Sequence, residues 1–128
     1  MVVLDSTFLI DFLKNKPSAV SKVKSFSDQV YTTRLNIFEL LVGAYRKNNE
    51  HELSVVLDLA HSINILELDD KSALKAAQIQ AELMQKGEMS PEIDVLIASI
   101  ALSNGDKTIV TQNVKDFVKI PGIKVESY

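Results

Sequence analysis

Two kinds of segment alternate along the chain: short runs of residues that favour β-strands, and longer stretches in which hydrophobic residues recur at helical spacing. The short runs predict strands at residues 2–4, 29–32, 63–68, 108–111 and 123–126. Between them, apolar residues recur every three or four positions, which predicts helices over about 6–13, 18–26, 37–47, 49–60, 70–86 and 91–103, and a short helical turn over 114–118. The first and fourth runs are apolar without alternation, as in strands covered on both faces. We therefore predict an α/β fold, a three-layer α/β/α sandwich with a mainly parallel, about five-stranded sheet.

Several residues mark where the predicted helices begin and end. Ser90-Pro91-Glu92 reads as a helix start, with a serine cap and proline at the first helical position. Gly87 ends the preceding helix, and Asp69 or Asp70 begins it. Asn104-Gly105-Asp106 predicts a turn before the fourth strand.

The composition is that of an ordinary globular chain. It has 128 residues, 46% hydrophobic and 24% charged, with no repeat or linker, so we expect one domain over residues 1–128. The absence of cysteine excludes disulfides, thiolate zinc sites and a cysteine nucleophile. No apolar run could span a membrane, and the N-terminus lacks the basic region of a signal peptide. We expect a cytoplasmic protein with no membrane partner.

The net charge of −3 is unlike that of most nucleic-acid-binding proteins, which are usually basic. That total misleads if several acids converge on a metal ion. If four of the 17 acids form one site, the remaining 13 nearly balance the 14 bases.

Four acids are expected at one edge of the sheet. Asp5 follows the first strand, Glu39 lies early in the helix after the second, Asp94 begins the helix before the fourth strand, and Asp116 follows that strand. Function gathers beyond the carboxyl ends of parallel strands. Carboxylates are preferred ligands of Mg²⁺ and Mn²⁺, so these acids predict a metal site.

Each acid also has a simpler interpretation. Asp5 could cap the first helix, Asn36-x-x-Glu39 could be a variant capping box, and Asp116 could be a surface acid. Asp94 is harder to explain without a function because the helix that follows it is apolar nearly all round. The two histidines, His51 and His61, have no carboxylate partner in the pattern and read as surface or packing residues.

The chain resembles PIN-domain proteins, and among them the VapC-type toxins of toxin–antitoxin pairs. Four segments between residues 2 and 123 carry the resemblance: Val2-Val3-Leu4-Asp5-Ser6-Thr7, Asn36-x-x-Glu39-Leu40-x-x-Gly43, Asp94-x-Leu96-Ile97-Ala98-x-x-Ala101-Leu102, and Ile109-Val110-Thr111-x-Asn113-x-x-Asp116-Phe117 ahead of Pro121-Gly122-Ile123.

The resemblance implies metal-ligand roles for Asp5, Glu39 and Asp94. Many PIN domains carry an acid where this chain has Asn113, so Asp116 supplies the fourth carboxylate in this interpretation and Asn113 holds a water. Ser6, Thr7 and Thr111 would support the ligands without binding metal themselves.

The implied activity is an endoribonuclease that uses one or two Mg²⁺ or Mn²⁺ ions and a metal-activated water to cleave RNA phosphodiester bonds. The implied partners are RNA, a small cognate antitoxin protein and a second copy of the chain in a homodimer.

Two alternatives stay open from the sequence. A receiver-like Mg²⁺-binding signalling domain also gathers acids beyond a parallel sheet, with Asp69 as a loose phospho-acceptor, but it has no use for Asp94 inside an apolar helix. The other alternative is a PIN-like nucleic-acid-binding module without catalysis, which Asn113 keeps open.

Overall fold

The computed structural model describes residues 1–27, 29–105 and 108–128, so the predicted turn at 104–106 has its last residue outside the described part. Within it the strands are β1 (Val2–Leu4), β2 (Val30–Thr33), β3 (Asn64–Leu66), β4 (Thr108–Val110) and β5 (Lys124–Glu126). They form one sheet in the order β3-β2-β1-β4-β5, and all four neighbouring pairs are parallel. The predicted parallel, five-stranded sheet is confirmed.

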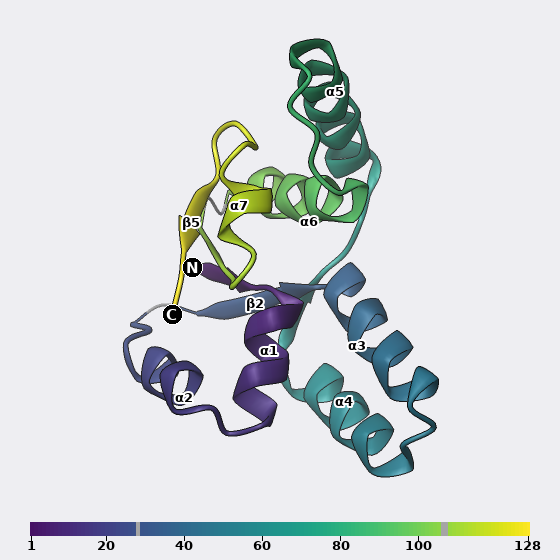
Figure 1. Cartoon of the computed structure of the whole chain (residues 1–128), viewed down its shortest axis with the longest axis vertical. Helices are drawn as coiled ribbons and strands as arrows, with labels where there is room; N and C mark the ends of the chain where they lie inside the picture. The colour runs from purple at the N-terminus through teal and green to yellow at the C-terminus, as the bar shows by residue number, and fades with distance from the viewer. Residues whose placement is uncertain (28, 106–107) are drawn as a thin grey trace.

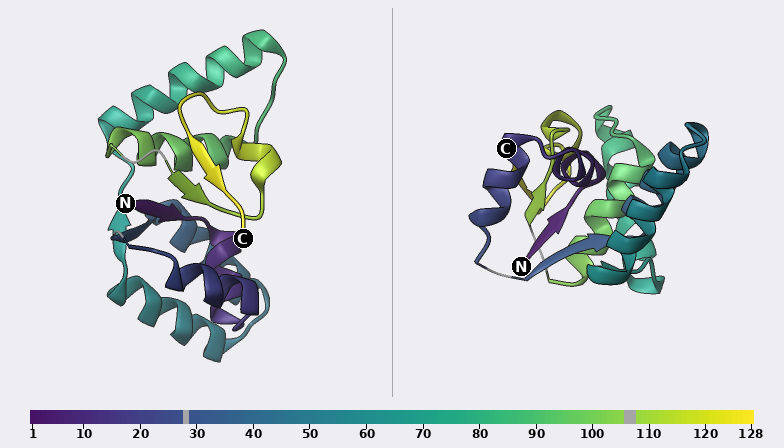
Figure 2. Two further views of the ribbon diagram at one scale, coloured as in Figure 1. Left: turned by 90° about the vertical axis from the view of Figure 1, so that its left-hand side faces the viewer. Right: turned by 90° about the horizontal axis from the view of Figure 1, so that it is seen from below.

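Helices cover both faces of this sheet. They are α1 (Ser6–Leu13), α2 (Pro17–Lys24), α3 (Arg34–Arg46), α4 (Glu50–Ser62), α5 (Asp70–Lys86), α6 (Glu92–Ser103) and α7 (Val114–Phe117). Figure 1 shows α5, α6 and α7 on one side of the sheet and α1 to α4 on the other, and the left view of Figure 2 shows the same separation. The fold is therefore the predicted α/β/α sandwich.

The central strand has apolar contacts on both sides. Val3 is fully buried in the cluster beneath α5 and α6, whereas Leu4 packs in the opposite cluster with Phe8 of α1 and Ile37 of α3. Successive residues of a strand point to opposite faces. This explains why the first strand reads as an unbroken apolar run.

Helix α6 is the buried helix that its apolar sequence predicts. Ile97, Ala98, Ile100 and Ala101 are each 0% exposed. The helix begins at Glu92, so its first turn places Asp94 at the buried edge of the sheet.

The predicted Ser90 cap of this helix is wrong. The structure has Pro91 at the N-cap position, with no side-chain capping hydrogen bond. The Ser90 hydroxyl instead donates to the main-chain carbonyl of Asp116 at 2.9 Å, because α7 lies against the start of α6. Ser90 therefore ties together the segments that carry Asp94 and Asp116.

Other boundaries move by one to three residues; the largest change is α3, which begins at Arg34 rather than Ile37. Helix α2 begins at Pro17 rather than Ser18, since proline lacks the N–H that the first helical position leaves unpaired. Asp69 caps α5, accepting a 2.9 Å hydrogen bond from the N–H of Ser72, as expected. Gly87 ends α5 with φ 68°, also as expected. In the described part of the chain, no helix is long and apolar enough to cross a membrane.

Candidate active site

The four predicted acids lie at the carboxyl edge of the sheet, around the end of the central strand. Asp5 follows β1, Glu39 lies in the second turn of α3, Asp94 in the first turn of α6, and Asp116 in α7 after β4. Asp5 and Asp94 are buried, at 2% and 6% exposed, and the other two are half-buried. Side chains distant in sequence thus share one small region because β1 lies between β2 and β4.

Asp5 is held by hydrogen bonds from three other segments. Its Oδ1 accepts from the Asn36 amide at 2.9 Å. Its Oδ2 accepts from the hydroxyls of Thr111 at 2.6 Å and Thr7 at 3.3 Å. Its side chain makes no capping hydrogen bond to α1, so the simple capping interpretation of Asp5 is wrong.

Asn36 is the residue that links two of the acids. It is 0% exposed, and its amide nitrogen donates both to Asp5 and to the Ser6 hydroxyl at 3.0 Å. Ser6 in turn donates to Oε1 of Glu39 at 2.6 Å. One buried amide therefore sets the positions of the Asp5 and Glu39 carboxylates.

The proposed capping box between Asn36 and Glu39 is also wrong. The box of α3 is formed by Thr33 and Asn36, whose side chain and main chain bond reciprocally. Because Asn36 completes the cap with its oxygen and donates to Asp5 with its nitrogen, the start of α3 and the acid site share one side chain. The sequence pattern suggested a cap with the wrong partner, Glu39, and gave no sign of the hydrogen bond from Asn36 to Asp5.

The loop after β4 supports Asp5 from the opposite side. The N–H of Asn113 donates to the Thr111 hydroxyl at 2.9 Å, and the N–H of Gln112 donates to the Thr7 hydroxyl at 3.0 Å. Each hydroxyl is thereby left to donate its own proton within the Asp5, Thr7 and Thr111 group. Ser6 therefore contacts Glu39, and Thr7 and Thr111 contact Asp5.

Asp94 lies in a different environment. No hydrogen bond or ion pair to its carboxyl group is present among the described residues. Burial, and then the charges of Asp5, Asp116 and Glu39, raise its pKa to about 7. Burial also raises the pKa values of Asp5 and Glu39, against the lowering effect of their hydrogen bonds. The four acids therefore interact electrostatically as one group.

The chemistry of this group fits a divalent cation. Carboxylate oxygens are the ligands that Mg²⁺ and Mn²⁺ prefer, and mutual repulsion is relieved by a cation among them. In the described part of the chain, no three His, Asp or Glu side chains already converge closely enough to hold an ion. Binding would therefore draw the carboxylates together from the positions seen here.

The remaining candidates lie apart from the acids. Asn113 is exposed, with its N–H directed to Thr111, and no contact of its side chain to an acid is present in the described residues. His61 is exposed and bonds the carbonyl of Leu57 in its own helix at 2.7 Å, as expected of a surface residue. The carboxylate of Asp69 caps α5 through its hydrogen bonds with Ser72. A receiver-like domain would need this carboxylate free to accept a phosphoryl group.

A protein-family model identifies the family of this chain. The model of the PIN domain matches residues 2–123, and this chain belongs to the PIN-domain family.

Individual relatives refine this class. The tRNA(fMet)-specific endonuclease VapC of Salmonella typhimurium is 31% identical over 128 residues, covering 98% of this chain and 96% of the relative. The structure of DNA-bound VapBC from Salmonella typhimurium superimposes with a TM-score of 0.87 at 31% identity, covering 98% of this chain and 96% of that one. VapBC2 from Rickettsia felis, bound to a promoter DNA fragment, has a TM-score of 0.88 at 24% identity over 100% and 99% of the two chains, and shows the shared fold.

We predict that removing the charge of Asp94 stabilises the metal-free protein. A carboxyl group whose pKa is raised in the folded state costs stability as pH rises from about 4, its unfolded pKa, toward 7. Asp94→Asn should therefore melt higher than the wild type in EDTA at pH 7.5, with a difference that shrinks toward pH 4.5. Differential scanning fluorimetry measures this, with Glu92→Gln, an exposed acid in the same helical turn, as the control. A lower melting temperature at pH 7.5 would contradict it.

We also predict that Asn36 sets metal affinity. Asn36→Ala removes the amide that orients Asp5 and Ser6, and loss of such supporting contacts typically weakens metal binding about 10–100-fold. Thr33→Ala is the matched control. It removes the hydroxyl that accepts from the N–H of Asn36 and donates to its side-chain oxygen, at a cost of about 0.5–2 kcal/mol, but keeps the amide nitrogen that donates to Asp5. Isothermal titration calorimetry with Mn²⁺ distinguishes the two. Equal affinities for both variants would show that Asn36 is only a cap.

Proposed function

We propose that this protein is a Mg²⁺- or Mn²⁺-dependent endoribonuclease and the toxin of a toxin–antitoxin pair. The observation that carries the proposal is Asp94, a buried carboxyl group whose pKa is raised to about 7 in part by the charges of the other three acids. A buried cluster of like charges costs stability, so its presence in a PIN-domain chain indicates a site kept for function.

Asp5, Glu39, Asp94 and Asp116 are the residues that would hold one or two ions. A divalent ion there would lower the pKa of a bound water and offset the charge of the scissile phosphate. Asp5 is the fixed member of the set, because Asn36 and Thr111 hold both of its oxygens. The carboxyl group of Asp94 has no hydrogen-bond partner among the described residues, so its oxygens are available to a ligand.

The neighbouring polar residues would position the acids. Ser6 fixes Glu39 through its 2.6 Å hydrogen bond, and Thr111 with Thr7 fixes Asp5. Asn113 lies at the exposed side of this network, where its amide could orient water or phosphate. No histidine is required as a general base in this scheme.

The partners follow from the family. The relatives named above are a VapC endonuclease and VapBC complexes. For this chain we propose RNA as the substrate, a small antitoxin as the inhibitor, a homodimer as the assembly and the cytoplasm as the compartment. The alternative is a PIN-like module that binds nucleic acid without cleaving it.

We predict that the purified protein cleaves RNA only with Mg²⁺ or Mn²⁺ and leaves 5′-phosphate and 3′-hydroxyl ends. EDTA should abolish the activity. Asp94→Asn should lower the rate at least about 100-fold, since it removes a ligand of the ion. Gel analysis of labelled RNA provides the readout, with Glu92→Gln retaining activity as the control. RNA binding without cleavage at any metal concentration would instead support the binding-module alternative.

The fourth position generates a separate prediction. A neutral amide binds a hard cation less well than a carboxylate does, so Asp116→Ala should raise the metal concentration needed for half-maximal cleavage, with activity partly restored at high metal. Asn113→Ala should lower the rate with a smaller change in metal requirement, and Asn113→Asp should be tolerated. Metal titrations of the cleavage rate compare the three variants. If Asn113→Ala alone loses metal dependence, the two roles are reversed.

A further inference from the structure

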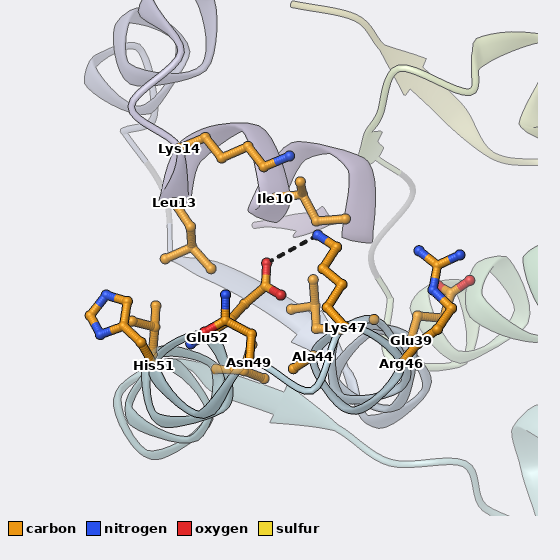
Figure 3. Close-up of a pocket in the computed structure, with 14 residues that line it drawn as sticks. Ile10, Leu13, Lys14, Glu39, Ala44, Arg46, Lys47, Asn49, His51 and Glu52 are labelled. Atoms are coloured by element: carbon orange, nitrogen blue, oxygen red, sulfur yellow. Dashed lines mark hydrogen bonds and ion pairs between the residues drawn. The ribbon is translucent and has the colours of Figure 1, made fainter.

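A cleft of about 290 Å³ lies between α1, α3 and α4. Glu39, one of the four acids, is among the residues that line this cleft (Figure 3). Its apolar lining comes from all three helices: Ile10, Leu13, Leu40, Ala44, Val55 and Val56.

Gly43 lines this cleft from the interior of α3. Glycine is unfavourable there compared with alanine, and Gly43 does not have the positive φ that would require it. Close helix packing does not require it either, because a Cβ at this position would meet no atom within 4 Å. Glu39, Gly43 and Lys47 are four residues apart and share one helix face, so the missing side chain leaves space in the cleft next to Glu39.

The polar rim of the cleft carries positive charge. Around it lie Lys14, which follows α1, Arg46 at the end of α3, and Lys47, which follows α3 (Figure 3). Lys47 pairs with Glu52 at 3.3 Å, whereas Lys14 and Arg46 have no ion-pair partner among the residues that the structure describes. Two exposed cations are thus free beside an apolar floor.

From this geometry we infer that the cleft binds the nucleotide next to the scissile bond of a single-stranded RNA, with Lys14 and Arg46 on its phosphates and the base over Gly43. The inference rests on the proposed ribonuclease function and assigns its substrate a path. A chain cut at the acids has to leave them, and the cleft that includes Glu39 offers both an apolar surface for a base and cations for phosphates. A volume near 300 Å³ is at the lower end for small-molecule sites, which suits one nucleotide.

Filling the space at Gly43 tests the inference. Gly43→Ala should raise the melting temperature by about 2–5 °C, because alanine is the better helix former. It should nevertheless raise the KM for RNA, and Gly43→Gln should raise it about tenfold or more with kcat and Mn²⁺ affinity retained, since the loss is in binding alone. Ser54→Gln, an exposed position of α4 outside the cleft, is the control.

The cations are tested through salt dependence. Each phosphate contact to a single strand contributes about 0.7 to the slope of log affinity against log salt. Removing two contacts with Lys14→Gln and Arg46→Gln should therefore lower the slope of log KM against log [KCl] by about 1.4. The paired control is Lys71→Gln with Lys75→Gln on α5, across the sheet from the cleft.

The outcomes separate this inference from the function on which it rests. A wild type that cleaves no RNA with either metal overturns both. A wild type that cleaves, with unchanged KM in Gly43→Gln and unchanged salt slope in the double variant, overturns the cleft alone. If those variants instead lose only the binding of a co-expressed antitoxin, the cleft belongs to a protein partner. A fall in melting temperature for Gly43→Ala would show that the glycine serves packing.

Discussion

The site depends on one buried carboxylate at the end of the central strand. Asp5 is only 2% exposed, so its oxygens need hydrogen-bond donors from the protein. Asn36, which follows β2, and Thr111, which follows β4, supply these donors from the two sides of β1. Satisfying this one group ties α1, the start of α3 and the loop after β4 to each other. The parallel order β2-β1-β4 is what makes the arrangement possible.

The same arrangement leaves Asp94 without such support. The hydrogen bonds on Asp5 and Glu39 stabilise their charged forms, and those charges raise the pKa of Asp94. Three carboxylates around an unsupported fourth make the metal-free protein less stable near neutral pH than a neutral site would be. A cation bound among these acids would attract each carboxylate and so offset their mutual repulsion.

The fold was predictable because its signals are local. Apolar runs predict the strands, and the apolar sequence after Asp94 predicts a buried helix. An acid in the first turn of such a helix is unexpected, which is why Asp94 stands out in the sequence. Asn36 could not be found in this way, because its partners Asp5 and Ser6 lie 31 and 30 residues away and its spacing to Glu39 imitates a cap. The prediction that Ser90 caps α6 was wrong for a related reason: its hydroxyl bonds a residue distant in sequence, the carbonyl of Asp116, instead of the start of its own helix.

Helix α3 combines requirements that pull against each other. Its first turn is stabilised by the reciprocal cap of Thr33 and Asn36, yet its interior contains Gly43, which weakens it. The cap lies before Glu39 in the helix, and Gly43 lies after it. The cap and the hydrogen bond from Asn36 to Asp5 hold the start of α3, so the helix can tolerate a glycine further along. The glycine that leaves space beside Glu39 therefore lies in the part of α3 where a loss of helix stability disturbs the Asp5 network least.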